Sequence, residues 1–467
     1  MPSGIQLLHL DILKRPVKLD EIQQGDSMVG TSGHTTRSGV AQSKYGWRLL
    51  MRKIAVAAAG LFTFALSFII PREASAIPAF SRQTGMSCTS CHFQHFPTLN
   101  SFGRAFKGGG YTMAGGQSMI EGDFLSLPST LNASFVTKIR YQKRNGDTEL
   151  GEAGELNKGS LQFPDKAAFL LGGRVGTYVG FLFEASLKDT NPRFISSKMP
   201  FVFGTGENAN ISVTPFTTDG FGPAYGLELL NTGAARQQRV LEHRTETSAQ
   251  QYIGTSIAAT GLTVAAINPL WFANYTIWAN EHATDVVRSI SSGPFLHYGR
   301  IAFTPTFAGW DLAIGGQLWN GTEKNLDDGA TTYKKAEAWA VDAQAQGSIG
   351  PIPVGLYLTY ARAAKSAGAS GKEQNLFNTS TARDKSASTI TGEVGVIPGR
   401  LTVAASYRDG QSGAAGNDTD NATTLGVVYT PIQNVQLQLD STWYSDEGGP
   451  TSAAGDNLTT LMLFASF

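Results

Sequence analysis

The long C-terminal part of the chain alternates between apolar and polar residues, and this pattern restricts its fold more than any other feature. The clearest alternating segments are 131–141, 179–187 and 435–443. Similar segments lie at 250–259, 297–305, 310–319, 335–346, 353–362, 401–408 and 422–430. A period of two places apolar side chains on one face of a β-strand and polar side chains on the other. The pattern therefore predicts an all-β fold.

The lengths of the connections between these segments indicate which all-β fold to expect. Short turns are predicted at 174–176, 259–261, 306–309, 347–352, 397–400 and 431–434. Long polar connections are predicted at 143–166, 188–221, 232–248, 270–296, 320–332, 364–384, 409–421 and 445–457. Alternation of short and long connections is typical of outer-membrane β-barrels. Eight long connections imply about 16 strands, or about 14 if the region 188–248 supplies no strand pair.

Composition agrees with a barrel that crosses a membrane. Only 16% of the residues are charged and 10% are aromatic, with 53 glycines. No segment after residue 80 approaches the roughly 20 apolar residues of a membrane helix. The chain also ends on an alternating segment that closes with Phe467, as outer-membrane barrels do. We therefore expect residues 117–467 to form a transmembrane, porin-like β-barrel in the outer membrane.

Net charge excludes one function class. Lysine and arginine together number 37, as do aspartate and glutamate. A nucleic-acid-binding protein needs a basic field, and this balance does not provide one.

A short motif near residue 90 carries the clearest chemistry. The only two cysteines of the chain lie in Cys88-Thr89-Ser90-Cys91-His92, which is the c-type haem attachment pattern. The two thiols add to the haem vinyl groups, and the imidazole reaches the iron from the proximal side. A zinc site needs four ligands, but no second cysteine pair exists. A thioredoxin-like dithiol needs a βαβ context, and none follows. The motif predicts one covalent haem c on Cys88 and Cys91, with His92 as proximal ligand.

The sixth ligand of the iron is less constrained by the sequence. Residues 77–116 form a small monohaem cytochrome c segment, which is too short to bury a haem without the rest of the chain. Met113 is the preferred candidate, because it lies far enough downstream for the chain to wrap around the haem. The alternatives are Met119, His95 and Met86. Each also fits another role: His95 beside a propionate or in the second shell, and the methionines in apolar packing.

The N-terminal residues indicate export. Residues 51–76 have a basic start, an apolar stretch at 54–70 and a small-residue site at 74–76, the three parts of a secretory signal peptide. A membrane anchor is the alternative for the apolar stretch. Export agrees with the haem motif, because covalent haem attachment follows export. Residues 1–50 precede the signal, and we assign them no function. They reflect either a start codon placed too far upstream or an extended, weakly structured leader.

The residues around the motif resemble a known family. Residues 78–97, 100–107 and 110–112 are similar to the fused cytochrome–porin family, whose members are outer-membrane monohaem c-type cytochromes of iron-oxidising bacteria. This resemblance implies oxidation of extracellular Fe(II) and electron transfer to a soluble periplasmic cytochrome. It carries Cys88, Cys91 and His92 over as haem residues, but no sixth ligand. The extension before Met51 departs from the family pattern.

Two other functions fit the same sequence. One is a diffusion porin with a haem-containing gate or sensor segment. The other is electron exchange with a different extracellular donor or acceptor. Acidic residues in the predicted loops offer oxygen ligands that could concentrate Fe(II), but they also fit ordinary solvated loops. These residues are Asp147, Glu149, Glu152, Glu155, Asp327 and Asp328.

Overall fold

The structure, a computed structural model, describes residues 78–123, 125–145, 158–188, 193–206, 209–234, 236, 240–282, 295–325, 332–368, 374–445 and 456–467. The predictions for 1–50, 51–76 and the six acidic loop residues lie outside these ranges. Helices α2 (Pro78–Thr84), α3 (Cys88–Cys91) and α4 (Ser101–Gly108) come first, followed by a hairpin of β1 (Met119–Gly122) and β2 (Leu125–Pro128). No helix among the described residues has the length and hydropathy to span a membrane.

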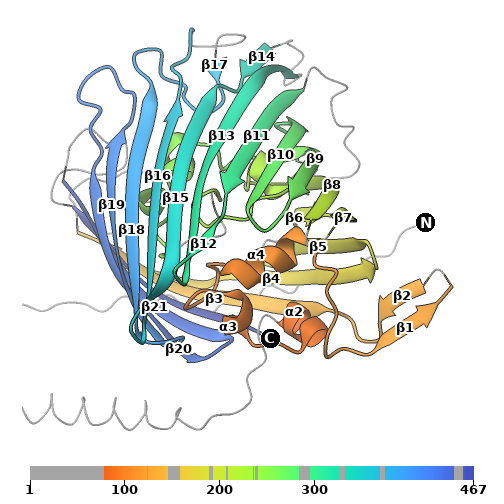
Figure 1. Ribbon diagram of the computed structural model, residues 1–467. Helices are drawn as coiled ribbons and strands as arrows, with labels where there is room; N and C mark the ends of the chain where they lie inside the picture. The colour runs from red at the N-terminus through yellow and green to blue at the C-terminus, as the bar shows by residue number, and fades with distance from the viewer. Residues whose placement is uncertain are drawn as a thin grey trace, which may run out of the picture. The chain divides into compact units, whose positions relative to one another are not determined.

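The rest of the described chain forms a closed barrel (Figure 1). Its first half contains β3 (Ala133–Arg144), β4 (Ser160–Gly176), β5 (Val179–Ser186), β6 (Arg193–Lys198), β7 (Phe201–Gly206), β8 (Ala209–Thr218), β9 (Ala259–Ile267), β10 (Trp271–Ala279), β11 (Leu296–Phe303), β12 (Thr306–Phe307) and β13 (Trp310–Asn325). Its second half contains β14 (Thr332–Lys335), β15 (Ala338–Ile349), β16 (Ile352–Ala363), β17 (Gln374–Asn375), β18 (Lys385–Ile397), β19 (Leu401–Gln411), β20 (Ala422–Ile432), β21 (Val435–Tyr444) and β22 (Asn457–Ser466).

Sixteen antiparallel strands make up the wall of this barrel in the described residues. Two of them are interrupted at a proline: β6 and β7 form one strand broken at Pro200, and β11 and β12 form one broken at Pro305. The short β14 and β17 belong to connections at the long-loop end. The predicted barrel of about 16 strands is therefore confirmed.

The seam of the barrel joins its first and last strands. β22 pairs with β3 from Leu458 to Ser466. The C-terminal Phe467 extends this pairing, because its amide donates to the Phe135 carbonyl at 3.0 Å and its carbonyl accepts from the Phe135 amide at 2.7 Å. The two rings also lie 5.2 Å apart. The terminal aromatic residue thus completes the closure.

Alternation along the strands separates an apolar outside from a polar inside. On β21, Leu437 and Leu439 are 40% and 50% exposed on the outer surface, whereas Gln438 and Asp440 are buried toward the lumen. Isoleucines and leucines are exposed on the outer wall in the same way on other strands, for example Ile301 and Ile314. This distribution is the one that a lipid-facing barrel requires.

The region 188–221 was predicted as a connection, and this prediction is wrong. It contains β6, β7 and β8, which supply two strands of the wall. The sequence signal is weak there because Pro200 and Pro215 have no amide hydrogen to donate and interrupt the alternation. Pairing nevertheless continues past the break, since the Met199 amide donates to the Pro215 carbonyl at 3.1 Å.

Two further boundaries differ from the predictions. Residues 259–261 were predicted as a short turn but begin β9, and the turn lies instead between Ile267 and Trp271. As a result, β10 falls within the predicted long connection 270–296. Gly261 resembles a turn residue in the sequence. In the structure a Cβ there would lie 2.4 Å from the Ile277 carbonyl oxygen, so the glycine permits a close strand approach.

The described residues of the connection between β8 and β9 fold into the lumen, and we call residues 219–234, 236 and 240–258 the lumen segment. It contains a 3-10 turn, η2 (Pro223–Tyr225), and the helices α6 (Arg244–Thr247) and α7 (Ala249–Ile253). Leu230 and Ile253 are fully buried in it. The sequence predicted an outer loop at 232–248 and a strand at 250–259, and both predictions are wrong. Apolar residues in this segment face an interior core formed with the barrel wall, not lipid.

Buried ion pairs attach the lumen segment to the barrel wall. Arg300 on β11 lies 3.0 Å from the Glu228 carboxylate of the lumen segment and 2.5 Å from Asp342 on β15. Thr232 donates to Asp342 at 2.6 Å. α7 also packs against β16 and β18. Other buried pairs join the segment to β19 and β21, so it is bonded to the wall from β11 round to β21.

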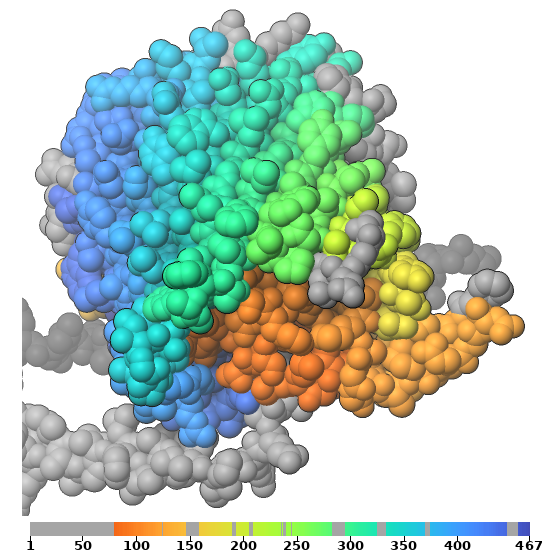
Figure 2. All heavy atoms as spheres, in the orientation of Figure 1, coloured from red at the N-terminus to blue at the C-terminus, as the bar shows by residue number. Residues whose placement is uncertain are grey.

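Residues 78–116, which we call the N-terminal segment, close the short-turn end of the barrel (Figures 1 and 2). Arg104 pairs with Asp311 at the start of β13 at 2.7 Å. The Cys88 amide donates to Gln433 in the β20–β21 turn at 2.8 Å. Asn231 of the lumen segment bonds both the amide and the carbonyl of Leu99, at 2.8 and 2.9 Å. The two segments therefore meet inside the barrel.

Candidate functional site

The cysteine motif folds as one helical turn held by the helix that follows it. Asn100 caps α4 by accepting from the Gly103 amide at 2.9 Å, and its own amide donates to the Ser90 carbonyl at 3.0 Å. A Cβ on Gly103 would lie 2.1 Å from the Cys91 carbonyl oxygen. Only glycine therefore allows α4 to approach α3 this closely. This packing fixes the backbone of both cysteines.

His92 follows the helix directly and is oriented by a backbone carbonyl. Its amide donates to the Cys88 carbonyl at 2.8 Å, and its Nδ1 lies 3.1 Å from the Thr98 carbonyl oxygen. A carbonyl only accepts, so Nδ1 carries the proton and Nε2 keeps its lone pair. Burial lowers the pKa of His92 to about 4, which keeps the ring neutral at pH 7. A neutral imidazole oriented in this way is a metal ligand.

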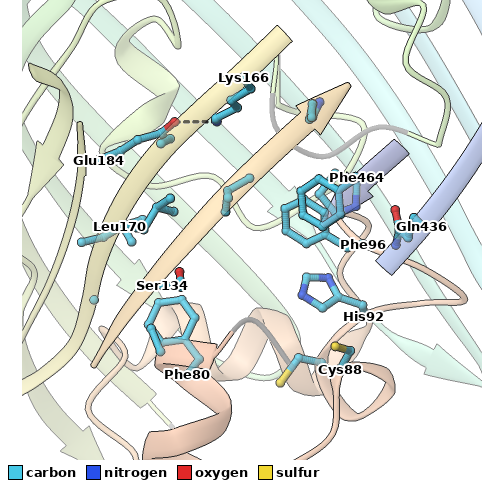
Figure 3. A pocket seen from close by; sticks show the side chains of 18 of the residues that line it. Phe80, Cys88, His92, Phe96, Ser134, Lys166, Leu170, Glu184, Gln436 and Phe464 are labelled. Atoms are coloured by element: carbon cyan, nitrogen blue, oxygen red, sulfur yellow. Dashed lines mark ion pairs between the residues drawn. The ribbon is translucent and has the colours of Figure 1, made fainter. Parts of the chain in front are cut away.

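A cavity of about 590 Å³ lies beside the motif (Figure 3). Its lining includes Cys88, Cys91 and His92 together. Neither thiol is in a disulfide. The volume lies within the range of roughly 300–1,000 Å³ that small-molecule and cofactor sites occupy. The structure thus brings all three residues of the predicted haem motif to one ligand-sized space.

The wall of the cavity near the motif is mainly apolar. Phe96 contacts both His92 and Phe464, with ring centroids 5.2 and 5.0 Å apart. Phe80 and Leu170 line the wall opposite in Figure 3. Ser134 also lines it, and its buried hydroxyl has no hydrogen-bond partner among the described residues. A buried, unpartnered hydroxyl fits a site that receives a ligand with polar groups.

Ion pairs line the remainder of the cavity. Glu242 of the lumen segment pairs with Lys138 at 3.2 Å and Arg140 at 2.6 Å, and Lys166 pairs with Glu184 at 2.5 Å. The basic lining residues are Lys107, Lys138, Arg140, Lys166, Lys188, Arg193 and Arg236, and the acidic ones are Asp165, Glu184, Asp219 and Glu242. Cations therefore exceed carboxylates in this lining.

These residues fit haem c. The two thiols and the imidazole that attachment and proximal ligation require line one cavity. The aromatic and aliphatic wall suits the faces of a porphyrin ring, and the excess of cations suits its two propionates. The fit draws on the N-terminal segment, β3–β5, β21, β22 and the lumen segment, so the whole chain contributes, as the short length of residues 77–116 predicted.

Of the four predicted candidates for the sixth ligand, the structure brings Met86 to this cavity and leaves the other three outside it. Met113 is 37% exposed, and its carbonyl accepts from Gln83 at 2.8 Å. Met119 lies in β1 of the small hairpin. His95 is buried, with Nδ1 2.9 Å from the Phe96 carbonyl and Nε2 3.4 Å from Glu393 on β18. None of the three lines the cavity.

Two methionines do line the cavity, Met86 and Met462. Met462 lies on β22 and is buried in a cluster with Val136 and Phe464, against which Phe96 packs. The sequence analysis missed it. The sequence does contain a sign of this residue. Met462 and Phe464 are apolar at lumen-facing positions of the last strand, where the flanking residues Thr460 and Ser466 are polar. A separate iron site of three or more His, Cys, Asp or Glu side chains is not found among the described residues.

Comparisons with known proteins give only a general likeness. No family model matches the chain, and no curated protein does. Among solved structures, OmpT of Vibrio cholerae is 10% identical with a TM-score of 0.43, over 75% of this chain and all of that chain. A mutant porin from Rh. blastica is 13% identical with a TM-score of 0.43, over 72% of this chain and all of that chain. Likenesses this distant carry no conclusion about function.

The fold and the site together define the structural class of this protein. The closed wall of sixteen strands and its apolar outer surface are those of a membrane-embedded β-barrel. Its short-turn end holds a cavity lined by a cysteine pair and a histidine.

Proposed function

We propose that this protein is an outer-membrane electron-transfer barrel that carries one haem c. Cys88 and Cys91 attach the haem, and His92 Nε2 is its proximal ligand. The protein oxidises extracellular Fe(II) to Fe(III) and passes each electron to a soluble periplasmic cytochrome, whose iron is reduced. Short turns of outer-membrane barrels face the periplasm, so the haem site lies on the side of that partner.

One observation supports the haem more than any other. The only two cysteines and the histidine of the motif line the same cavity, and the Thr98 carbonyl leaves His92 Nε2 available as a ligand. The choice of Fe(II) as donor and the direction of transfer rest on the family resemblance.

The residues of the chain have distinct roles in this proposal. The thiols hold the group, Thr98 orients His92, and Phe96 and Phe464 exclude water from one side. Basic side chains of the lining would pair with the propionates. The bound haem supplies one-electron oxidation and reduction at its iron.

Adding Fe(II) to the oxidised, haem-loaded protein under anaerobic conditions is expected to produce the absorption spectrum of the reduced haem. The measurement is a reduced-minus-oxidised difference spectrum, followed by reoxidation with an oxidised soluble c-type cytochrome. A matched sample receives Zn(II), which has the same charge but no accessible redox change, and should show no difference. If the haem stays oxidised while the reconstituted barrel conducts small solutes, the protein is a gated diffusion porin.

Replacing Met462 by alanine is expected to change the oxidised spectrum and lower the reduction potential of the haem. Of the thioethers lining the cavity, Met462 is the one that the barrel wall supplies from outside the N-terminal segment, and a thioether ligand raises the potential. We therefore place Met462, in preference to Met113, at the sixth position. The M462A haem should also bind added imidazole or cyanide faster.

Met113→Ala is the matched control, because Met113 is a methionine outside the cavity lining. Its spectrum and potential should equal those of the wild type. A changed spectrum in Met86→Ala together with an unchanged one in Met462→Ala assigns the ligand to Met86 instead.

A further inference from the structure

The cavity extends well beyond the haem motif, along the inner wall of the barrel. Strand β4 lines it from Gly172, which lies against Phe80, to Asp165. Gly172 and Asp165 are separated by about 23 Å along the strand, at roughly 3.3 Å per residue. Lys188 and Arg193, on either side of the connection between β5 and β6 at the long-loop end, line it as well. The space therefore extends from the motif to the far end of β5.

The position of the lumen segment explains why this space remains. Its buried ion pairs and α7 attach it to β11, β15, β16, β18, β19 and β21, and leave the inner face of β3–β5 less covered. Beside β3, β4 and β5 it lines the cavity with a few side chains, of which Glu242 spans the gap to Lys138 and Arg140. A passage therefore runs along the inner face of these strands, and we call it the β3–β5 channel.

The outer part of the β3–β5 channel is polar and reaches solvent. Arg193 pairs with Asp219 at 2.5 Å, and the Arg193 side chain is 46% exposed. Arg140 pairs with Asp165 at 2.8 Å. Paired charges along a passage favour hydrated solutes over apolar ones. The channel therefore changes from hydrated at the long-loop end to apolar beside the motif.

We propose that the β3–β5 channel admits a small, hydrated or chelated metal ion from the long-loop end to the edge of the haem. Electron exchange then takes place inside the barrel, at the haem edge. A space of about 590 Å³ excludes a mineral surface or a redox protein as a direct donor. This inference rests on the proposed function for the identity of the donor, but the channel itself is independent of it.

The test uses a single thiol placed in the channel of the haem-loaded protein. Ala168 is buried, lines the cavity and lies on β4 between Asp165 and Gly172. In Ala168→Cys, the new thiol is the only one not bound to haem. Two methanethiosulfonate reagents of similar size and opposite charge are applied, and their labelling rates are compared. Both reagents are expected to react.

The route is tested by reversing charge at the long-loop end. Adding Lys188→Glu and Arg193→Glu is expected to raise the ratio of cationic to anionic labelling about tenfold at low salt, because local charge alters the concentration of an approaching ion. The control Arg383→Glu changes an exposed arginine that does not line the channel, and should leave the ratio unchanged. No labelling, or an unchanged ratio in the double charge reversal, overturns the channel.

The outcomes separate this inference from the proposed function. If labelling follows the prediction but Fe(II) fails to reduce the haem, the channel stands and the donor is wrong. If no haem is attached, Cys88 and Cys91 are themselves thiols that line the cavity, and labelling of these two residues by the same reagents tests the same route. If Fe(II) reduces the haem but the thiol is not labelled, electron transfer stands and the channel is wrong.

Discussion

Replacing Cys88 and Cys91 together by alanine is expected to abolish covalent haem attachment completely while leaving the barrel intact. The chain has no other cysteine that could substitute. The strands that close the wall, β3 to β22, do not include the motif, so their pairing does not depend on it. Attachment is measured by haem staining after denaturing electrophoresis, and barrel formation by the mobility difference between heated and unheated samples.

The matched control changes the two residues between the cysteines. Thr89→Ala with Ser90→Ala keeps both thiols and the spacing, and should retain full staining. The single variant Cys88→Ala should keep one thioether, on Cys91, and a shifted absorption spectrum. Staining that survives denaturation in the double cysteine variant, or that is absent from wild type made with a haem-attachment system, contradicts the haem proposal.

The sequence predicted the wall of the barrel well, because lipid and lumen impose opposite polarity on alternate residues. Leu437 and Leu439 face outward and Gln438 and Asp440 inward, as alternation requires. The strand prediction failed where proline residues interrupt this alternation. At Pro200 and Pro215 the alternation is interrupted although the pairing continues.

The lumen segment could not be predicted for a different reason. Its apolar residues pack against other apolar residues inside the barrel, and this core appears only after the wall closes. Residues 249–253 form a helix that Ser248 caps and Gly254 ends, at a φ of 99°. Alternating apolar residues over 250–259 resemble a strand, so the local pattern predicted a strand where the structure has a helix.

The residues of the site also differ in whether they could be predicted from local sequence. The haem motif is local, so five consecutive residues were sufficient to predict Cys88, Cys91 and His92 as a group, and the structure brings them to one cavity. A ligand supplied from a distant strand is not local. Met462 lies 370 positions after His92 in the chain, and only the pairing of β22 with β3 brings it to the same cavity.

Replacing Arg300 by methionine is expected to detach the lumen segment and increase the ion conductance of the barrel. The Arg300 and Asp342 side chains are fully buried, and the Glu228 side chain is 3% exposed. Removing the shared cation leaves two carboxylates uncompensated, a change that costs about 3–5 kcal/mol for buried pairs. At a pH high enough to keep both carboxylates ionised, reaching water relieves this cost, so the lumen segment should leave the wall. Single-channel recordings in a planar bilayer measure the result.

Two further variants separate release of the segment from general damage to the fold. Arg362→Met breaks an exposed ion pair with Asp384, which is worth about 0–1 kcal/mol, and should leave the conductance at the wild-type level. Combining Arg300→Met with Glu228→Leu and Asp342→Leu replaces the whole buried cluster with apolar side chains, which is often neutral for buried ion pairs. That triple variant should conduct as little as the wild type. If it conducts as much as Arg300→Met alone, the ions do more than balance charge. If Arg300→Met conducts no more than wild type, they do not hold the lumen segment in place.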